Sequence, residues 1–120
     1  MRRFHQLLSI AAFSAAFAVP AFAADCPAAG PAPTIPDGAT GTVDQFKAAH
    51  TQVQSYVNSL QSIQDCNEAK IKMAPKGTKP DDLQKLRDAG NQAIDQAKAI
   101  SDSYSAQVKI FKARAPAAPK

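Results

Sequence analysis

The chain has 120 residues, of which 14 are Lys or Arg and 10 are Asp or Glu, so its formal net charge is +4 at pH 7. A chain of this length forms one small domain at most, and with no Trp and 7% aromatic residues it lacks the material for a deep core. Arg2 and Arg3 lie in a segment that we expect to be removed, which leaves a net charge of +2. That balance gives no strong case for a nucleic-acid partner, and we expect none.

Residues 1–23 have the organisation of a secretory signal peptide. The basic start is followed by an apolar run over residues 7–19 and by Ala21-Phe22-Ala23, a small-x-small cleavage site. The apolar run is shorter than the roughly 20 residues that a membrane-spanning helix needs. We therefore expect cleavage near Ala23 and a mature chain that is periplasmic or secreted.

Residues 24–42 are predicted to form a Pro-rich, extended arm. Prolines recur between Pro27 and Pro36, which excludes a helix and favours polyproline II, and Asp37-Gly38 predicts a turn. In an oxidising compartment Cys26 and Cys66 are expected to form a disulfide, with an intermolecular bridge or metal binding as the alternatives. Because the arm can cover about 50 Å, it can run back along a following helix and be fixed near its far end by that bridge.

Residues 43–114 are predicted to form an antiparallel two-helix hairpin, a coiled-coil-like all-α fold. Along residues 43–74, and again beyond Pro75-Lys76-Gly77-Thr78-Lys79, apolar or small residues alternate at spacings of three and four, as in a heptad repeat. Positions whose numbers add to 153 are predicted to face each other, and four of the five central pairs set a large side chain against a small one. The predicted hairpin seam consists of Phe46, Val53, Tyr56, Leu60 and Ile63 on the first helix and Leu86, Gly90, Ala93, Ala97, Ile100 and Tyr104 on the second.

Local signals mark the ends of both helices. Thr42 and Gln45 fit a capping box, and Pro75 disfavours helix at the residue before it. Pro80 and the acidic pair after it suit the first turn of the second helix. Two i, i+4 ion pairs are expected on the surface, Glu68–Lys72 and Asp81–Lys85. Residues 115–120 are expected to be a disordered tail.

The residues that carry chemistry in other proteins are sparse here. His50 is the one histidine of the mature chain, and no His, Cys or Glu stands three or four residues from it, as a metal site on a helix would need. Neither cysteine belongs to a C-x-x-C motif, and no phosphate-cradling glycine loop is present. We therefore expect no enzyme activity, no catalytic or metal site and no cofactor.

One resemblance concerns most of the mature chain. The stretch Ile35-Pro36-Asp37-Gly38-Ala39-Thr40, a long helix with a cysteine near its end, and a second helix ending in Phe111-Lys112-Ala113-Arg114 together resemble a group of small exported proteins of proteobacteria. The resemblance implies an envelope location and a helical hairpin. It implies no assigned activity and no catalytic residue.

Two classes of function follow. The favoured one is a non-enzymatic structural or interaction protein of the periplasm, since a hairpin presents long faces that suit another helix, an unfolded chain or a second copy. The alternative is a binder of anionic lipid or polymer at the envelope surface through Lys109, Lys112, Arg114 and Lys120.

Four apolar residues beside the seam indicate what the hairpin binds. Val43, Val57, Ile94 and Val108 would be half covered in a lone hairpin, so either the arm or a second copy must cover them. We favour a dimer in which the arm covers the side near Cys66, with another envelope protein as the alternative partner.

Overall fold

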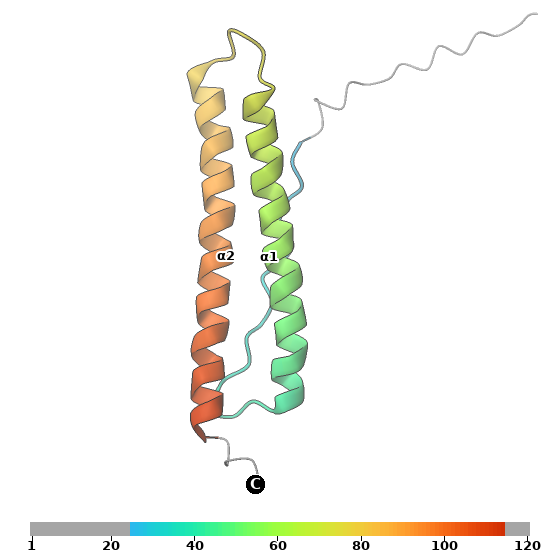
Figure 1. Cartoon of the computed structure of the whole chain (residues 1–120), viewed down its shortest axis with the longest axis vertical. Helices are drawn as coiled ribbons and strands as arrows, with labels where there is room; N and C mark the ends of the chain where they lie inside the picture. Colours follow the sequence, from blue (N-terminus) through green and yellow to red (C-terminus); the bar gives the residue numbers. More distant parts are fainter. Residues whose placement is uncertain (1–24, 115–120) are drawn as a thin grey trace, which may run out of the picture.

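The structure, a computed structural model, describes residues 25–114 and consists there of two long antiparallel helices preceded by an extended arm (Figure 1). Helix α1 spans Val43–Lys72 and helix α2 spans Pro80–Arg114. The predicted all-α hairpin is therefore confirmed. The predicted signal peptide, residues 1–23, and the predicted tail, residues 115–120, lie outside the described residues.

The N-terminus of α1 has the capping box that the sequence predicts. The backbone N–H of Gln45 donates to Thr42 Oγ1 at 3.3 Å, and the backbone N–H of Thr42 donates to Gln45 Oε1 at 2.8 Å. Helix α1 ends at Lys72, two residues before the end of the predicted stretch. Met73 still donates to the carbonyl of Ala69, and the chain then turns through Gly77, whose φ of 91° an L side chain would resist.

Helix α2 begins at Pro80, where the missing N–H costs nothing because the first helical N–H groups have no partner within the helix. The predicted Asp81–Lys85 pair is wrong. Lys85 instead lies 3.6 Å from Asp82, one residue closer, which is equally accessible on a helix surface. The predicted Glu68–Lys72 pair is present at 3.9 Å.

The core is a single stripe between the two helices. Its centre is Leu60, which is 1% exposed, and Ala93 of α2, which is 4% exposed and lines the same region. Phe46, Ala49 and Val53 extend the buried stripe along α1. On α2 only Gly90 and Ala93 are buried, and the other predicted seam residues on the two helices are half-buried: Tyr56, Ile63, Leu86, Ala97, Ile100 and Tyr104.

The buried stripe on α1 ends in a polar residue. Asn67 stands four residues after Ile63, continues the heptad spacing, and is 4% exposed. Its amide Nδ2 donates to the carbonyl of Ile63 at 2.8 Å, which satisfies one of its donors within the helix. The side chain packs over Gly90, with its Cβ 3.8 Å from where a glycine Cβ would lie. A small residue at position 90 therefore makes room for the buried amide.

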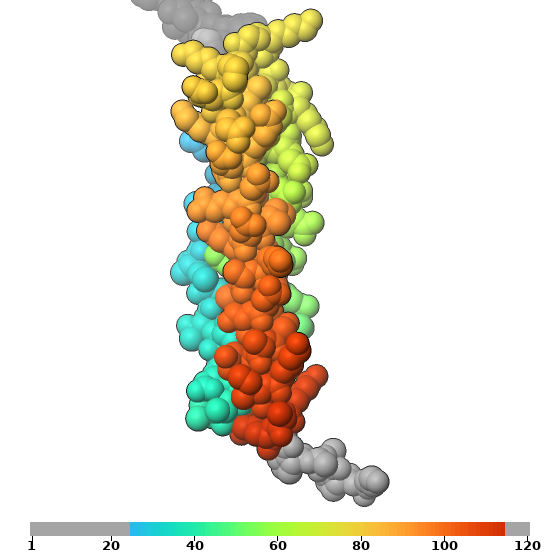
Figure 2. All heavy atoms as spheres, turned by 90° about the vertical axis from the view of Figure 1, so that its left-hand side faces the viewer, coloured from blue at the N-terminus to red at the C-terminus, as the bar shows by residue number. Residues whose placement is uncertain are grey.

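The arm covers one side of the groove between the helices. Residues 27–29 line a groove with Leu60 and Ala93, and residues 30–34 lie along α1 beside the stretch from Thr51 to Ser59. The arm thus runs antiparallel to α1 from Cys66 towards the start of that helix (Figure 1). Figure 2, which looks onto α2, shows the arm along one side of that helix and α1 on the other. We call this side of the hairpin the arm face.

The close packing of Leu60 and Ala93 at the centre of the buried stripe leads to a testable prediction. Ala93→Leu should overpack the seam against Leu60 and lower the free energy of unfolding by about 1–3 kcal/mol. Ala99→Leu makes the same change at an exposed position of the same helix and should alter it by less than about 0.5 kcal/mol. Urea unfolding followed by circular dichroism measures both. Equal losses in the two variants would contradict this packing.

Candidate interaction surfaces

The arm is fixed at its first end by the disulfide that the sequence predicts. Cys26 and Cys66 are bonded, with their Cα atoms 5.7 Å apart, and residues 25–114 contain no free cysteine. Beside the bridge, Lys70 Nζ lies 3.8 Å from the carboxylate of Asp25. Because that carboxylate is fully exposed, the ion pair adds little, and the covalent bond is what holds this end.

The arm is fixed at its second end by a turn that binds the last turns of α2. Residues 37–41 form the turn, and we call them the clasp. The backbone N–H of Gly38 donates to Gln107 Oε1 at 2.7 Å, and Arg114 Nε donates to the Gly38 carbonyl at 2.6 Å. Arg114 Nη2 donates to the carbonyl of Gly41. Hydrogen bonds from a charged donor are stronger than neutral ones, so Arg114 is the main polar contact of the clasp.

Two glycines allow the clasp to lie this close. A Cβ on Gly38 would lie 2.6 Å from Cβ of Ile110 and closer still to the carbonyl oxygen of Gln107. A Cβ on Gly41 would lie 2.9 Å from the ring of Phe46. Both separations are shorter than van der Waals contact, so the fit of the arm against α2 at Gly38, and against Phe46 of α1 at Gly41, depends on the absence of these side chains.

Aromatic side chains fill the space between the clasp and the two helices. The rings of Phe46 and Phe111 have centroids 4.8 Å apart, and those of Phe46 and Tyr104 are 6.2 Å apart, both tilted. Tyr104 donates its hydroxyl to the carbonyl of Phe46 at 3.1 Å, and the Arg114 guanidinium lies 4.9 Å from the Phe111 centroid. This cluster closes the end of the hairpin opposite the turn.

Arg114 therefore has a role that sequence reasoning missed. The sequence predicts the same anion-binding role for it as for Lys109, Lys112 and Lys120, whereas its guanidinium binds two backbone carbonyls of the arm. Lys109 and Lys112 are exposed, whereas Lys120 lies outside the described residues. The sequence pattern predicts no role for Gln107 either. No periodic pattern distinguishes such contacts, which join residues 69 and 76 positions apart.

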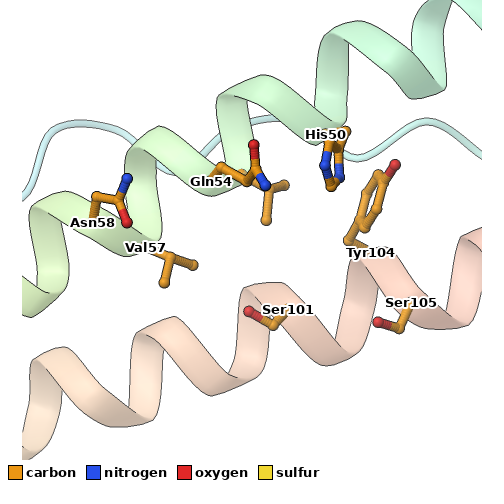
Figure 3. A pocket seen from close by; sticks show the side chains of 8 residues that line it. His50, Gln54, Val57, Asn58, Ser101, Tyr104 and Ser105 are labelled. Carbon is orange, nitrogen blue, oxygen red and sulfur yellow. The ribbon is translucent and has the colours of Figure 1, made fainter.

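The side of the hairpin opposite the arm carries a groove formed by α1 and α2 alone, with a volume of about 510 Å³. We call this side the open face. Figure 3 shows the side chains of both helices directed into the space between them, with His50 beside Tyr104 and Val57 across from Ser101. The His50 and Tyr104 ring centroids are 5.8 Å apart. The groove is lined by His50, Val53, Gln54, Val57, Asn58, Ser101, Tyr104 and Ser105.

Apolar residues extend the open face in both directions. Ile94 and Val108 stand seven residues on either side of Ser101, two helical turns away on the same side of α2. Val43 stands fourteen residues before Val57 on α1. Val43 is 53% exposed and Ile94 42% exposed, while Val57 and Val108 are half-buried. The arm therefore leaves uncovered the apolar residues that the sequence placed beside the seam.

The described residues also bear on metal binding and on membrane insertion. Within residues 25–114 no cluster of three His, Cys, Asp or Glu side chains is placed to hold a metal ion. Neither α1 nor α2 has the combination of length and apolar character required to span a bilayer. Comparison with known proteins found no match to this chain among protein-family models, curated proteins or solved structures.

The disulfide predicts a measurable loss of stability on reduction. Opening the bridge, whose cysteines are 40 residues apart, should lower the free energy of unfolding by up to about 4 kcal/mol, because the unfolded chain regains loop entropy. Unfolding of the purified mature protein with and without reductant measures this. Intact mass after alkylation, which should detect thiols only in the reduced sample, checks that the bridge is intramolecular.

The two glycines of the arm offer a matched pair for testing the clasp. Gly38→Ala should lower the free energy of unfolding by about 1–3 kcal/mol, because the added methyl group meets the backbone and side chains of α2. Gly30→Ala has nothing within 4 Å of the new methyl group and should be neutral or stabilising by about 0.4–1 kcal/mol. Thermal unfolding separates the two. A Gly38→Ala variant as stable as Gly30→Ala would show that the clasp is not docked.

Proposed function

We propose that this chain is a non-enzymatic structural or interaction protein of the bacterial periplasm. In this proposal, export removes residues 1–23, oxidation forms the Cys26–Cys66 bridge, and the mature protein presents a rigid helical surface to a partner in the envelope. One observation carries the proposal: the arm is fixed over one face of the hairpin at both ends, while the opposite face keeps an open groove with exposed apolar residues beside it.

The disulfide supports the location. Structural disulfides persist in oxidising compartments such as the periplasm and are rare where thiols are kept reduced. Here the bridge is an integral part of the fold, because it fixes the arm along α1. The apolar run of residues 7–19 and the Ala-x-Ala cleavage site after it have the organisation of a secretory signal peptide, which would direct export.

The shape of the open face supports the mode of action. Helix α1 has 30 residues and is about 45 Å long, so the face can contact a partner helix over many turns. Recognition of this kind uses apolar anchors at helical spacing with polar groups around them. On this face Ile94 and Val108 stand fourteen residues apart on α2 and Val57 lies on α1. The polar residues His50, Asn58 and Ser101 line the groove together with Val57.

The second candidate, binding of an anionic surface by the C-terminal end of α2, has less support. Lys109 and Lys112 are exposed and available, but Arg114 contributes its charge to the clasp. Each cation near an anionic membrane contributes about 1 kcal/mol, so two or three give only weak and salt-dependent attachment.

In-cell photo-crosslinking tests the proposed function. A photoreactive residue at Asn58, exposed on the open face, should give a discrete protein adduct in the envelope fraction of a Gram-negative host. The same residue at Ala99 is the control, because Ala99 is exposed and lies about 200° around α2 from Ser101. Sequencing the N-terminus of the recovered protein, expected near Ala24, tests export.

The outcomes separate the two candidates. No adduct from Asn58, or equal yields from both positions, would contradict an interaction through the open face. Adducts with lipid or polymer from a probe at Lys112, in the absence of protein adducts from Asn58, would favour the anionic surface instead. A protein that retains residues 1–23 and is recovered from the cytoplasm would overturn the location.

A further inference from the structure

The exposed surface of α1 lacks charge over its whole central part. Residues 48–64 contain no Asp, Glu, Lys or Arg, although 20% of the chain is charged, which would place about three charges in a stretch of this length. Ten of these residues are exposed, and five of the ten line the grooves beside the arm. The five exposed residues away from those grooves are His50, Gln54, Asn58, Gln61 and Ser62. Surfaces that become buried in a complex are depleted of charge at their centre, since a charge there would be desolvated.

Opposite charges stand at the two ends of this uncharged stretch. Lys47 precedes it and Asp65 follows it, eighteen residues later, which is five helical turns, so both lie on the same row of α1. Within residues 25–114 the ion pairs involve other lysines and carboxylates, and neither Lys47 nor Asp65 has a partner. The row that joins them reads Lys47, Thr51, Gln54, Asn58, Gln61, Asp65.

This row is symmetric about residue 56. Reflection through that point exchanges Lys47 with Asp65, Thr51 with Gln61, and Gln54 with Asn58. The two ends therefore exchange opposite charges, and the interior positions exchange uncharged polar residues. A two-fold axis passing near residue 56, perpendicular to α1, would bring each charge against its opposite in a second copy.

We propose that a second copy of this chain binds the open face, with α1 packed antiparallel against its counterpart. The result is a four-helix bundle with two Lys47–Asp65 contacts at its rim and both arms on its outer surfaces. Val57 and Ile94 lie on the inner side of this contact, where an apolar core is needed. The rim charges set the orientation, as charged residues beside the core do in coiled coils.

The dimensions of the face are sufficient for a stable dimer. Each helix is about 45 Å long and about 10 Å across, so the two packed helices of one copy together present roughly 900 Å² to a partner. Specific protein interfaces bury about 800 Å² on each partner. A second copy on the open face therefore meets that size without any contribution from the arm.

Sedimentation equilibrium of the purified, oxidised mature protein tests which face is used. The wild-type protein should sediment as a dimer that dissociates on dilution. Ile94→Lys should abolish the dimer while the circular dichroism spectrum stays helical, because position 94 is 42% exposed within one copy. Ala99→Lys places the same charge on the other side of α2 and should leave the dimer intact. A wild-type monomer at every concentration, or an unchanged dimer in Ile94→Lys, would overturn the proposal.

Charge reversal tests the antiparallel orientation. Lys47→Glu sets two carboxylates together at each rim contact, and Asp65→Lys sets two lysines together, so each variant alone should dimerise about tenfold more weakly. A mixture of the two variants should regain wild-type affinity, because in the mixed dimer both contacts again join opposite charges. Positions 47 and 65 are about 27 Å apart within one copy, far beyond screening distance, so only contact between copies can restore affinity. A mixture no tighter than the two variants alone would exclude this orientation.

This test is independent of the location and biological role proposed above. It uses purified protein and reports only on self-association. A failure here would leave a different envelope protein as the occupant of the open face. Absence of any adduct from Asn58 would count against both proposals, because Asn58 lies in the row that faces the second copy. Recovery of an unprocessed chain from the cytoplasm would overturn the proposed location alone and leave the dimer standing.

Discussion

The disulfide between Cys26 and Cys66 is the constraint on which the rest of the structure depends. Two helices that share one stripe of buried residues have a thin core, with Leu60 as their one large side chain below 2% exposure in the described chain. The bridge adds a third layer by holding the arm along α1, although the arm has no hydrogen-bonded secondary structure of its own. An unattached Pro-rich segment would spend most of its time in solvent, since it offers few apolar contacts to offset its ordering. Covalent attachment near one end removes much of that cost.

The sequence predicts those parts of the fold that repeat or that obey local rules. The heptad spacing from Phe46 to Ile63 gives the helices, Thr42 and Gln45 give the first residue of α1, and the reach of the arm gives its course along that helix. The paired cysteines follow from their number and from the expected compartment. Each of these predictions depends only on residues close together in the sequence or on the length of a segment.

The parts that were missed are single long-range contacts made by polar residues. Asn67 continues the heptad, but an asparagine at that spacing reads equally well as the end of the stripe, and only the structure shows it buried over Gly90. Arg114 reads as a cation at a helix C-terminus, where the helix dipole favours it in any case. Its bonds to Gly38 and Gly41 depend on where the arm lies, which no local pattern specifies. The sequence predicts four apolar residues beside the seam that the arm or a second copy must cover, but it predicts neither the open face nor the groove lined by His50, Val57 and Tyr104.

The two attachments of the arm also differ in when the chain can make them. Cys26 and Cys66, which are 40 positions apart, both precede α2, so the loop between them can close before that helix exists. Gln107 and Arg114 lie near the C-terminal end of α2. The turn at Gly38 therefore cannot form its hydrogen bonds until that part of the chain has been synthesised or exported. A chain that leaves a ribosome or an export channel from its N-terminus therefore presents both thiols early and its clasp partners last. The disulfide at one end of the arm can therefore form before the hydrogen bonds of the clasp at the other end. A chain truncated before Arg114 would keep the disulfide but lose the hydrogen bonds from Arg114 to the clasp.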